Sequence, residues 1–313
     1  MRVAVVDIGS NSTRLLIADV DAASGAIKEV LRRSEVTRLG EGLDASGSLA
    51  EHAVERVLRT LADYRREIQS SGASANLALL TAAVREAANG EAFAERVRDE
   101  FQLDTSVLSG EEEARLTFLG ATADQPGGER GLAREPTVVI DIGGGSTEFV
   151  IGRGRVAGFH TSLPVGVVRL SERHIHSDPP APQELDRLTQ DVRASFQQGL
   201  PADERATVRR AIAVAGTATS AAAIAQRLEP YDPARVHGYV LALAAVDAML
   251  ARVAAMSEAE RRSLAGLHPD RAPTIVAGLI ILAEALRSFE LDAVTVSEHD
   301  ILYGGALRLA GLG

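Results

Sequence analysis

The sequence contains neither cysteine nor tryptophan, and Lys28 is the single lysine among its 33 basic residues. Without cysteine the chain can form no disulfide and no thiolate metal site, so we expect it to work in a reducing compartment. A phosphate loop that ends in Gly-Lys-Ser/Thr is excluded as well, because Lys28 lies in the unrelated segment GAIKEV.

Long apolar stretches are also missing. The longest ones, TIVAGLIILA and GYVLALAAV, are too short to cross a bilayer, and the N-terminus lacks the features of a secretory signal. The formal net charge of −10 disfavours nucleic-acid binding, which depends on a basic surface. We therefore expect a soluble cytoplasmic protein that binds neither membranes nor nucleic acids.

What the chain does contain is an internal repeat. The segment VAVVDIGSNSTRLLIA, residues 3–18, returns without gaps as VVIDIGGGSTEFVIG, residues 138–152. The offset between the two copies is constant at 141 − 7 = 134 residues. The residues shared by the two loops are Asp7, Gly9, Ser12 and Thr13, which return as Asp141, Gly143, Ser146 and Thr147.

Each copy reads as a strand, a hairpin, a second strand, a turn and a third strand. A dinucleotide-binding fold would place a helix directly after the glycines, whereas TEFVIG favours a strand. Amphipathic or buried helices are predicted near 49–69, 183–198, 238–255 and 272–289, with further strands at 210–215 and 293–296. The segment 124–136 is rich in Gly, Pro and charge, which is typical of a domain boundary.

The predicted fold class is therefore α/β, with two domains of one plan over 1–124 and 125–313. We expect an interdomain cleft that both hairpin loops face, and a C-terminal helix, 301–312, that packs back on the first domain.

Glycines and small polar residues leave backbone N–H groups free to form a concave nest for an anion. The aspartate that opens each loop suits Mg²⁺, which takes carboxylate and phosphate oxygens. The plainer alternative is two hairpin turns whose glycines meet a need for positive φ. The gapless duplication of the aspartate, serine and threonine favours phosphate binding.

These loops resemble the paired phosphate loops of the sugar kinase, actin and heat-shock chaperone superfamily. More narrowly, the chain resembles the exopolyphosphatase and guanosine pentaphosphate phosphohydrolase family, and its length indicates the short, two-domain form. The segments that carry this likeness are AVREAAN (83–89), SGEEEARLTFLGA (109–121), LPVGVVRLSERH (163–174) and AVAGTATSAAAI (213–224). The resemblance implies an actin-like (ribonuclease H-like) fold, removal of terminal phosphates from polyphosphate or pentaphosphate alarmones, and a homodimer.

Hydrolysis of a phosphoanhydride needs an oriented water and charge neutralisation. The acidic helix start SGEEEARL provides candidates for activating the water, although its spacing alone does not distinguish Glu111, Glu112 and Glu113. The resemblance indicates Glu113 as the water-activating residue and Glu112 as its neighbour.

The second predicted catalytic residue is Glu148. It stands where the first copy has Arg14, so the two loops have unequal roles. We expect Glu148 to bind Mg²⁺ or Mn²⁺ together with Asp141 and Asp7, and the resemblance likewise makes Glu148 essential.

Further residues are predicted to bind phosphate. Helix N-termini attract phosphate, and arginine forks bind pairs of oxygens. Besides the loop residues, the set includes the start of the helix after strand 210–215 and two arginines: Gly9, Ser10, Asn11, Ser12, Gly143, Gly144, Gly145, Ser146, Thr147, Gly216, Thr217, Arg38 and Arg85.

One motif departs from the family. Its usual S-x-x-G-L-R-x-G reads SEHDILYGG here, with His299 and Asp300 in the altered positions. An acidic chain slows the approach of long polyanions, so we expect short polyphosphates to be preferred. The alternatives are guanosine pentaphosphate hydrolysis, a sugar-kinase-like transfer for which no aspartate base is evident, and a non-catalytic nucleotide or polyphosphate sensor.

Overall fold

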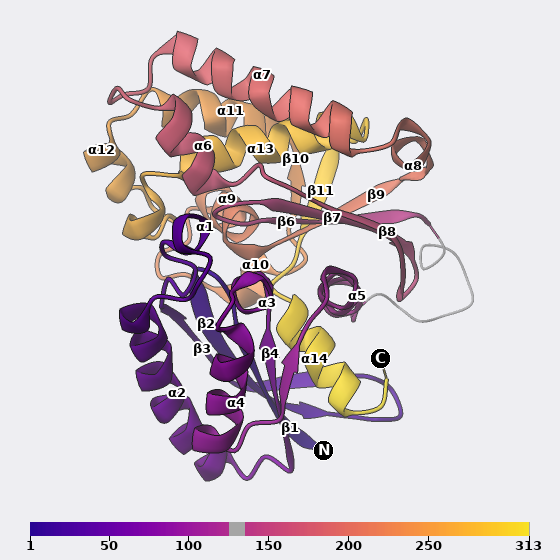
Figure 1. The fold of residues 1–313 in the computed structure, drawn as a ribbon. Helices are drawn as coiled ribbons and strands as arrows, with labels where there is room; N and C mark the ends of the chain where they lie inside the picture. The colour runs from indigo at the N-terminus through magenta and orange to yellow at the C-terminus, as the bar shows by residue number, and fades with distance from the viewer. Residues whose placement is uncertain (125–134, 313) are drawn as a thin grey trace. The chain divides into compact units, whose positions relative to one another are not determined.

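Two units make up the protein in the computed structural model, which describes residues 1–124 and 135–312 (Figure 1). Unit 1 comprises Met1–Asp124 and Asp300–Gly313, and unit 2 comprises Gln125–His299. Each unit contains one β-sheet with helices packed on it.

The sheet of unit 1 has the strand order β3-β2-β1-β4-β5. β1 pairs antiparallel with β2, and β2 pairs antiparallel with β3, while β4 and β5 continue the sheet parallel to β1. The strands are β1 (Arg2–Ile8), β2 (Ser12–Val20), β3 (Ile27–Val36), β4 (Ala75–Leu80) and β5 (Thr105–Val107).

The sheet of unit 2 repeats this plan. Its order, β10-β11-β9-β6-β7-β8, contains the same antiparallel hairpin pair followed by two parallel strands, with β10 added antiparallel at the edge. The predicted duplicated α/β unit is confirmed. The strands are β6 (Thr137–Ile142), β7 (Thr147–Arg153), β8 (Val156–Leu163), β9 (Arg210–Val214), β10 (Val240–Ala242) and β11 (Ala293–Val296).

Helices cover both faces of the unit 1 sheet (Figure 1). Side chains alternate along β1, so that Ala4, Val6 and Ile8 pack toward α2 and α4, and Val3 and Val5 pack toward α5 and α14. The helices of this unit are α1 (Leu43–Ser46), α2 (Glu51–Ser71), α3 (Ala82–Glu86), α4 (Gly90–Phe101), α5 (Gly110–Ala121) and α14 (Ile301–Leu309).

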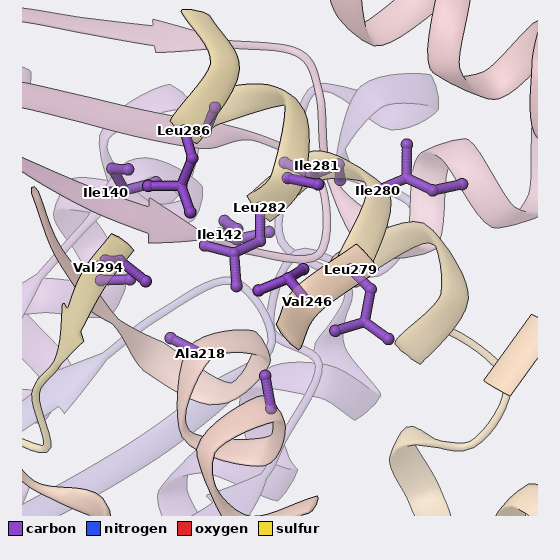
Figure 2. Close-up of a cluster of buried hydrophobic side chains, with 14 of the residues drawn as sticks. Ile140, Ile142, Ala218, Val246, Leu279, Ile280, Ile281, Leu282, Leu286 and Val294 are labelled. Atoms are coloured by element: carbon purple, nitrogen blue, oxygen red, sulfur yellow. The ribbon is translucent and has the colours of Figure 1, made fainter. Parts of the chain in front are cut away.

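In unit 2 the core is organised around α13. Figure 2 shows Leu282 and Leu286 of α13 beside Ile140 and Ile142 of β6. This helix is buried along most of its length. The helices of unit 2 are α6 (Val167–His174), α7 (Pro182–Gly199), α8 (Ala202–Thr207), α9 (Ala215–Gln226), α10 (Pro233–Val236), α11 (Leu243–Ala254), α12 (Glu258–Arg262), η2 (Pro269–Arg271) and α13 (Ile275–Ser288).

The prediction of one helix over 238–255 is wrong at its start. Val240–Ala242 form β10, which pairs with β11, and the helix begins only at Leu243. Tertiary pairing with β11 has overridden the helical tendency of the segment. Among residues 1–124 and 135–312, no helix combines the length and apolar character needed to cross a membrane.

The last helix, α14, belongs to unit 1 and packs closely against α5 (Figure 1). The contact depends on two glycines. A Cβ at Gly304 would overlap the carbonyl oxygen of Leu116, and a Cβ at Gly120 would overlap that of Asp300. The two helix backbones therefore touch without intervening side chains.

We expect Gly304→Ala to lower the free energy of unfolding by about 1–3 kcal/mol, because the added methyl group must push α14 away from α5. Urea unfolding measures the change. Gly110→Ala is the matched control, since a Cβ there meets no atom within 4 Å. Equal stability of the two variants would contradict this account of the helix contact.

Candidate active site

The two predicted phosphate loops close in the same way. In loop 1, residues 9–12, the amide of Gly9 donates to the carbonyl oxygen of Ser12 at 3.0 Å. In loop 2, residues 143–146, the amide of Gly143 donates to the carbonyl oxygen of Ser146 at 2.9 Å. The sequence repeat is therefore also a repeat of backbone conformation.

The loop glycines do not serve a left-handed backbone, since none of Gly9, Gly143, Gly144 and Gly145 has positive φ. Steric crowding does not explain all of these glycines either. A Cβ at Gly144 would lie 3.5 Å from Val168, and one at Gly145 would lie 3.9 Å from Arg169, which are ordinary contacts. What glycine provides at these two positions is bare backbone that a ligand can approach.

Each loop is held by a neighbouring segment of its own unit. Loop 1 accepts backbone hydrogen bonds from Thr37 and Arg38 at Asn11 and from Gly40 at Ser10. Loop 2 accepts them from the start of α6. The amide of Val167 donates to Gly143 at 3.0 Å, and the amides of Val168 and Arg169 donate to Gly144 at 2.9 and 3.2 Å.

The first difference between the repeats lies across the β1–β2 hairpin, where Asp7 stands directly opposite Arg14. Asp7 is 4% exposed, and Nε and Nη2 of Arg14 donate to its Oδ2 at 2.9 and 2.6 Å. Burial raises the pKa of Asp7, while Arg14 opposes that rise. The positive charge of Arg14 beside Asp7 disfavours a cation at this carboxylate, and the role of Asp7 as a metal ligand stays a prediction.

In unit 2 the same cross-strand position pairs Asp141 with Glu148. Two carboxylates directly opposite each other repel. Glu148 Oε1 accepts hydrogen bonds from the hydroxyls of Ser146 and Ser162 at 2.6 and 2.7 Å, which orient the carboxylate without neutralising it. The oxygen donors of Asp141 and Glu148 are those that a hard divalent cation prefers.

The three glutamates at the start of α5 have different environments. Glu112 forms a capping box: its backbone amide donates to the Ser109 hydroxyl, and its Oε2 accepts from the Ser109 amide at 2.9 Å. The hydrogen bonds that the Glu112 carboxylate accepts from the backbone amide and the hydroxyl of Ser109 lower the pKa of Glu112. Glu111 is exposed, whereas Oε2 of Glu113 accepts from Nη1 of Arg85 at 3.1 Å.

Arg85, which lies on α3, orients the side chain of Glu113. The same Nη1 atom also donates to the carbonyl oxygen of Leu108 at 2.8 Å, just before α5. Loop 1, Arg85 and Glu113 follow β1, β4 and β5, respectively, so all three lie at the carboxyl edge of the parallel strands of unit 1. Ligands of open α/β sheets bind at this edge.

The other predicted residues are placed as follows. Arg38 is exposed, has a φ of 49°, and contributes its backbone amide to loop 1. Gly216 and Thr217 lie in the first turn of α9, which follows β9 at the carboxyl edge of the unit 2 sheet. The guanidinium of Arg271 lies against Gly216 so closely that any side chain there would displace it.

Sequence reasoning missed three features of the site. The spacing Ser109-x-x-Glu112 is a capping-box signature that removes Glu112 from the catalytic candidates. The segment LPVGVVRLSERH forms the start of α6 against loop 2, and no local signal connects the two. Asp300, treated only as a departure from a motif, is an ion-pair partner of Arg14.

Bare glycine loops, opposed carboxylates and helix starts at the carboxyl edges of both sheets define a phosphate-handling α/β protein. A model of the Ppx/GppA phosphatase family matches residues 16–308. Exopolyphosphatase 2 of Mycobacterium tuberculosis (strain ATCC 25618 / H37Rv) is 39% identical over 321 aligned residues, with 99% of each chain covered.

Solved structures agree. The Aquifex aeolicus member of the Ppx/GppA family has a TM-score of 0.86 at 31% identity, covering 99% of this chain and 97% of that one. An exopolyphosphatase from Cytophaga hutchinsonii has a TM-score of 0.84 at 25% identity, with 100% and 99% covered. This chain belongs to the Ppx/GppA phosphatase family, and it is a hydrolase.

If loop 2 keeps its glycines for a ligand, Gly145→Ala will leave the melting temperature nearly unchanged but weaken substrate binding, with KM raised about tenfold. Gly166→Ala is the contrasting variant, because a Cβ there would overlap the backbone of Gly144 and Gly145 and should lower the melting temperature. Thermal unfolding and steady-state phosphate release measure both. A large loss of stability in Gly145→Ala would show that the glycine serves the fold.

Proposed function

We propose that the protein is an exopolyphosphatase, which removes the terminal phosphate of inorganic polyphosphate by attack of a water that Glu113 activates. The observation that carries the proposal is the ion pair of Glu113 with Arg85 at the carboxyl edge of the sheet that also ends in loop 1. The relative that is 39% identical, with 99% of each chain covered, is named an exopolyphosphatase, which supports polyphosphate as the substrate class.

Glu113 is suited to activating water because its carboxylate is oriented and still reachable. Its side chain is 28% exposed, and Nη1 of Arg85 holds its Oε2 at 3.1 Å. A positioned carboxylate can accept the proton of a water as that water attacks phosphorus. Glu112 cannot take the role without breaking its capping box, and Glu111 points to solvent.

A divalent cation, Mg²⁺ or Mn²⁺, fits the donor set of Asp141 and Glu148, and the hydroxyl groups of Ser146 and Ser162 hold Glu148 for it. When bound, the cation neutralises charge on the phosphate oxygens and lowers the barrier to displacement. Backbone amides of loops 1 and 2, other than those of Gly9 and Gly143 that close the loops, would then bind the remaining phosphate oxygens.

Phosphate release by the purified protein tests the proposal. Substrates are polyphosphates of several chain lengths and guanosine pentaphosphate, with Mg²⁺, with Mn²⁺ and without metal. We expect metal-dependent release from polyphosphate, faster on short chains, and a loss of at least about a hundredfold in Glu113→Gln. Glu111→Gln, two residues earlier in the same helix and exposed, is the matched control and should keep normal turnover.

Other results would redirect the proposal. Release from guanosine pentaphosphate alone would make the protein an alarmone phosphohydrolase that uses the same loops. Faster turnover on very long chains would refute the preference for short ones. Binding of polyphosphate without release would identify a sensor, and Glu113 would then have no catalytic role.

The metal site is tested without activity. We expect Mg²⁺ to raise the melting temperature of the wild-type protein by several degrees, because a ligand that binds only the folded state stabilises it. Asp141→Asn replaces one of the two carboxylates of the proposed site with a neutral amide, so this variant should gain little or nothing from Mg²⁺. An equal response of both proteins to Mg²⁺ would place the cation elsewhere.

A further inference from the structure

We propose that Asp300 is a positioning residue for hydrolysis, which holds loop 1 through Arg14 and the Glu113 helix through its backbone. The inference rests on the proposed role of Glu113 and loop 1. It concerns a residue at the start of the C-terminal helix that touches neither substrate nor metal in the mechanism above.

Asp300 uses its two carboxylate oxygens for different purposes. Oδ1 accepts from the backbone amide of Leu302 at 3.0 Å and so caps the N-terminus of α14. Oδ2 pairs with Nη1 of Arg14. A cap alone needs only the first of these oxygens, so the second points to an additional role.

Arg14 connects Asp300 to the strand that leads into loop 1. While Nη1 faces Asp300, Nε and Nη2 bind Oδ2 of Asp7, two residues before Gly9. The planar guanidinium fork can bridge two carboxylates in this way, whereas an ammonium group lacks the required geometry. Asp7 and Asp300 are 4% and 3% exposed, so the bridge between them is largely shielded from water.

A second arginine also lies near Asp300. Nη2 of Arg32, on β3, lies 3.8 Å from its Oδ2. Although burial opposes ionisation of Asp300, Arg14 and Arg32 hold its pKa below the usual value. Both arginines therefore stabilise the ionised form of the buried Asp300 carboxylate, and a neutral group at this position would lose these interactions.

The backbone of Asp300 also fixes α5. Its carbonyl oxygen occupies the space where a Cβ of Gly120 would be, and one turn further along α14 Gly304 meets Leu116 in the same way. Glu113 lies in the first turn of that same α5. Asp300 therefore contacts both elements that have to be aligned, the hairpin of loop 1 and the helix of Glu113.

The principal test is Asp300→Asn. Asparagine keeps an oxygen for the helix cap but presents a neutral group, or an NH₂ donor, to Arg14 and Arg32. We expect kcat to fall at least about tenfold while KM stays within about twofold, because a small misalignment of catalytic groups lowers the rate more than it lowers binding. Arg14→Lys, which keeps the positive charge but not the bridge, should behave alike.

Tyr303→Phe is the matched control on the same helix. It removes a partly buried hydrogen bond of 2.9 Å from the tyrosine hydroxyl to Glu29 and changes neither Asp300 nor Arg14. We expect it to lower the melting temperature about as much as Asp300→Asn without changing kcat. If kcat fell in both variants in proportion to their loss of stability, Asp300 would only cap the helix, and the positioning role would be wrong.

A double-mutant cycle separates the bridge from independent effects. If Asp300 acts through Arg14, the Arg14→Lys, Asp300→Asn double variant loses no more kcat than the more impaired single variant. Fully multiplicative losses would overturn the bridge. Wild-type protein that releases no phosphate from any substrate would instead contradict the proposed function, so the two failures are distinguishable.

Discussion

The charge that faces the aspartate across each β-hairpin distinguishes the two halves of this protein. In unit 1, Arg14 lies opposite Asp7 and is itself countered by Asp300. In unit 2, the equivalent position holds Glu148 opposite Asp141, so two negative charges face each other. One substitution in an otherwise faithful repeat thus places opposite charges across one hairpin and like charges across the other.

Much of the fold could be predicted because the repeat is carried by local features. The sequence itself indicates an apolar strand, the Asp-Ile-Gly turn and a second strand in each copy. The backbone hydrogen bond from Gly9 to Ser12 likewise has its equivalent between Gly143 and Ser146. Where the prediction failed, the decisive contact was distant in sequence. Val240–Ala242 form a strand because β11, some fifty residues later, pairs with them.

The candidate site likewise contains features that are local in the sequence and features that depend on distant contacts. The acidic helix start was visible, but the choice among its glutamates depends on Arg85, which lies 28 residues before Glu113. The capping box of Ser109 and Glu112 was the one local clue that could have narrowed the choice. No local pattern connects Arg14 with Asp300, which are separated by 286 positions, because only the packing of α14 brings them together.

That packing also affects the order of assembly during synthesis. Unit 1 is built from two separate stretches of chain, whereas unit 2 is one continuous stretch lying between them. One face of the first sheet, packed against α14 in the native protein, therefore lacks that cover until the residues after unit 2 have been made. Domains usually fold in order from the N-terminus during synthesis, whereas here unit 1, which contains the N-terminus, is completed after unit 2. During synthesis the apolar residues Val3 and Val5 of β1 lack their contact with α14 until the helix that begins at Ile301 has been made.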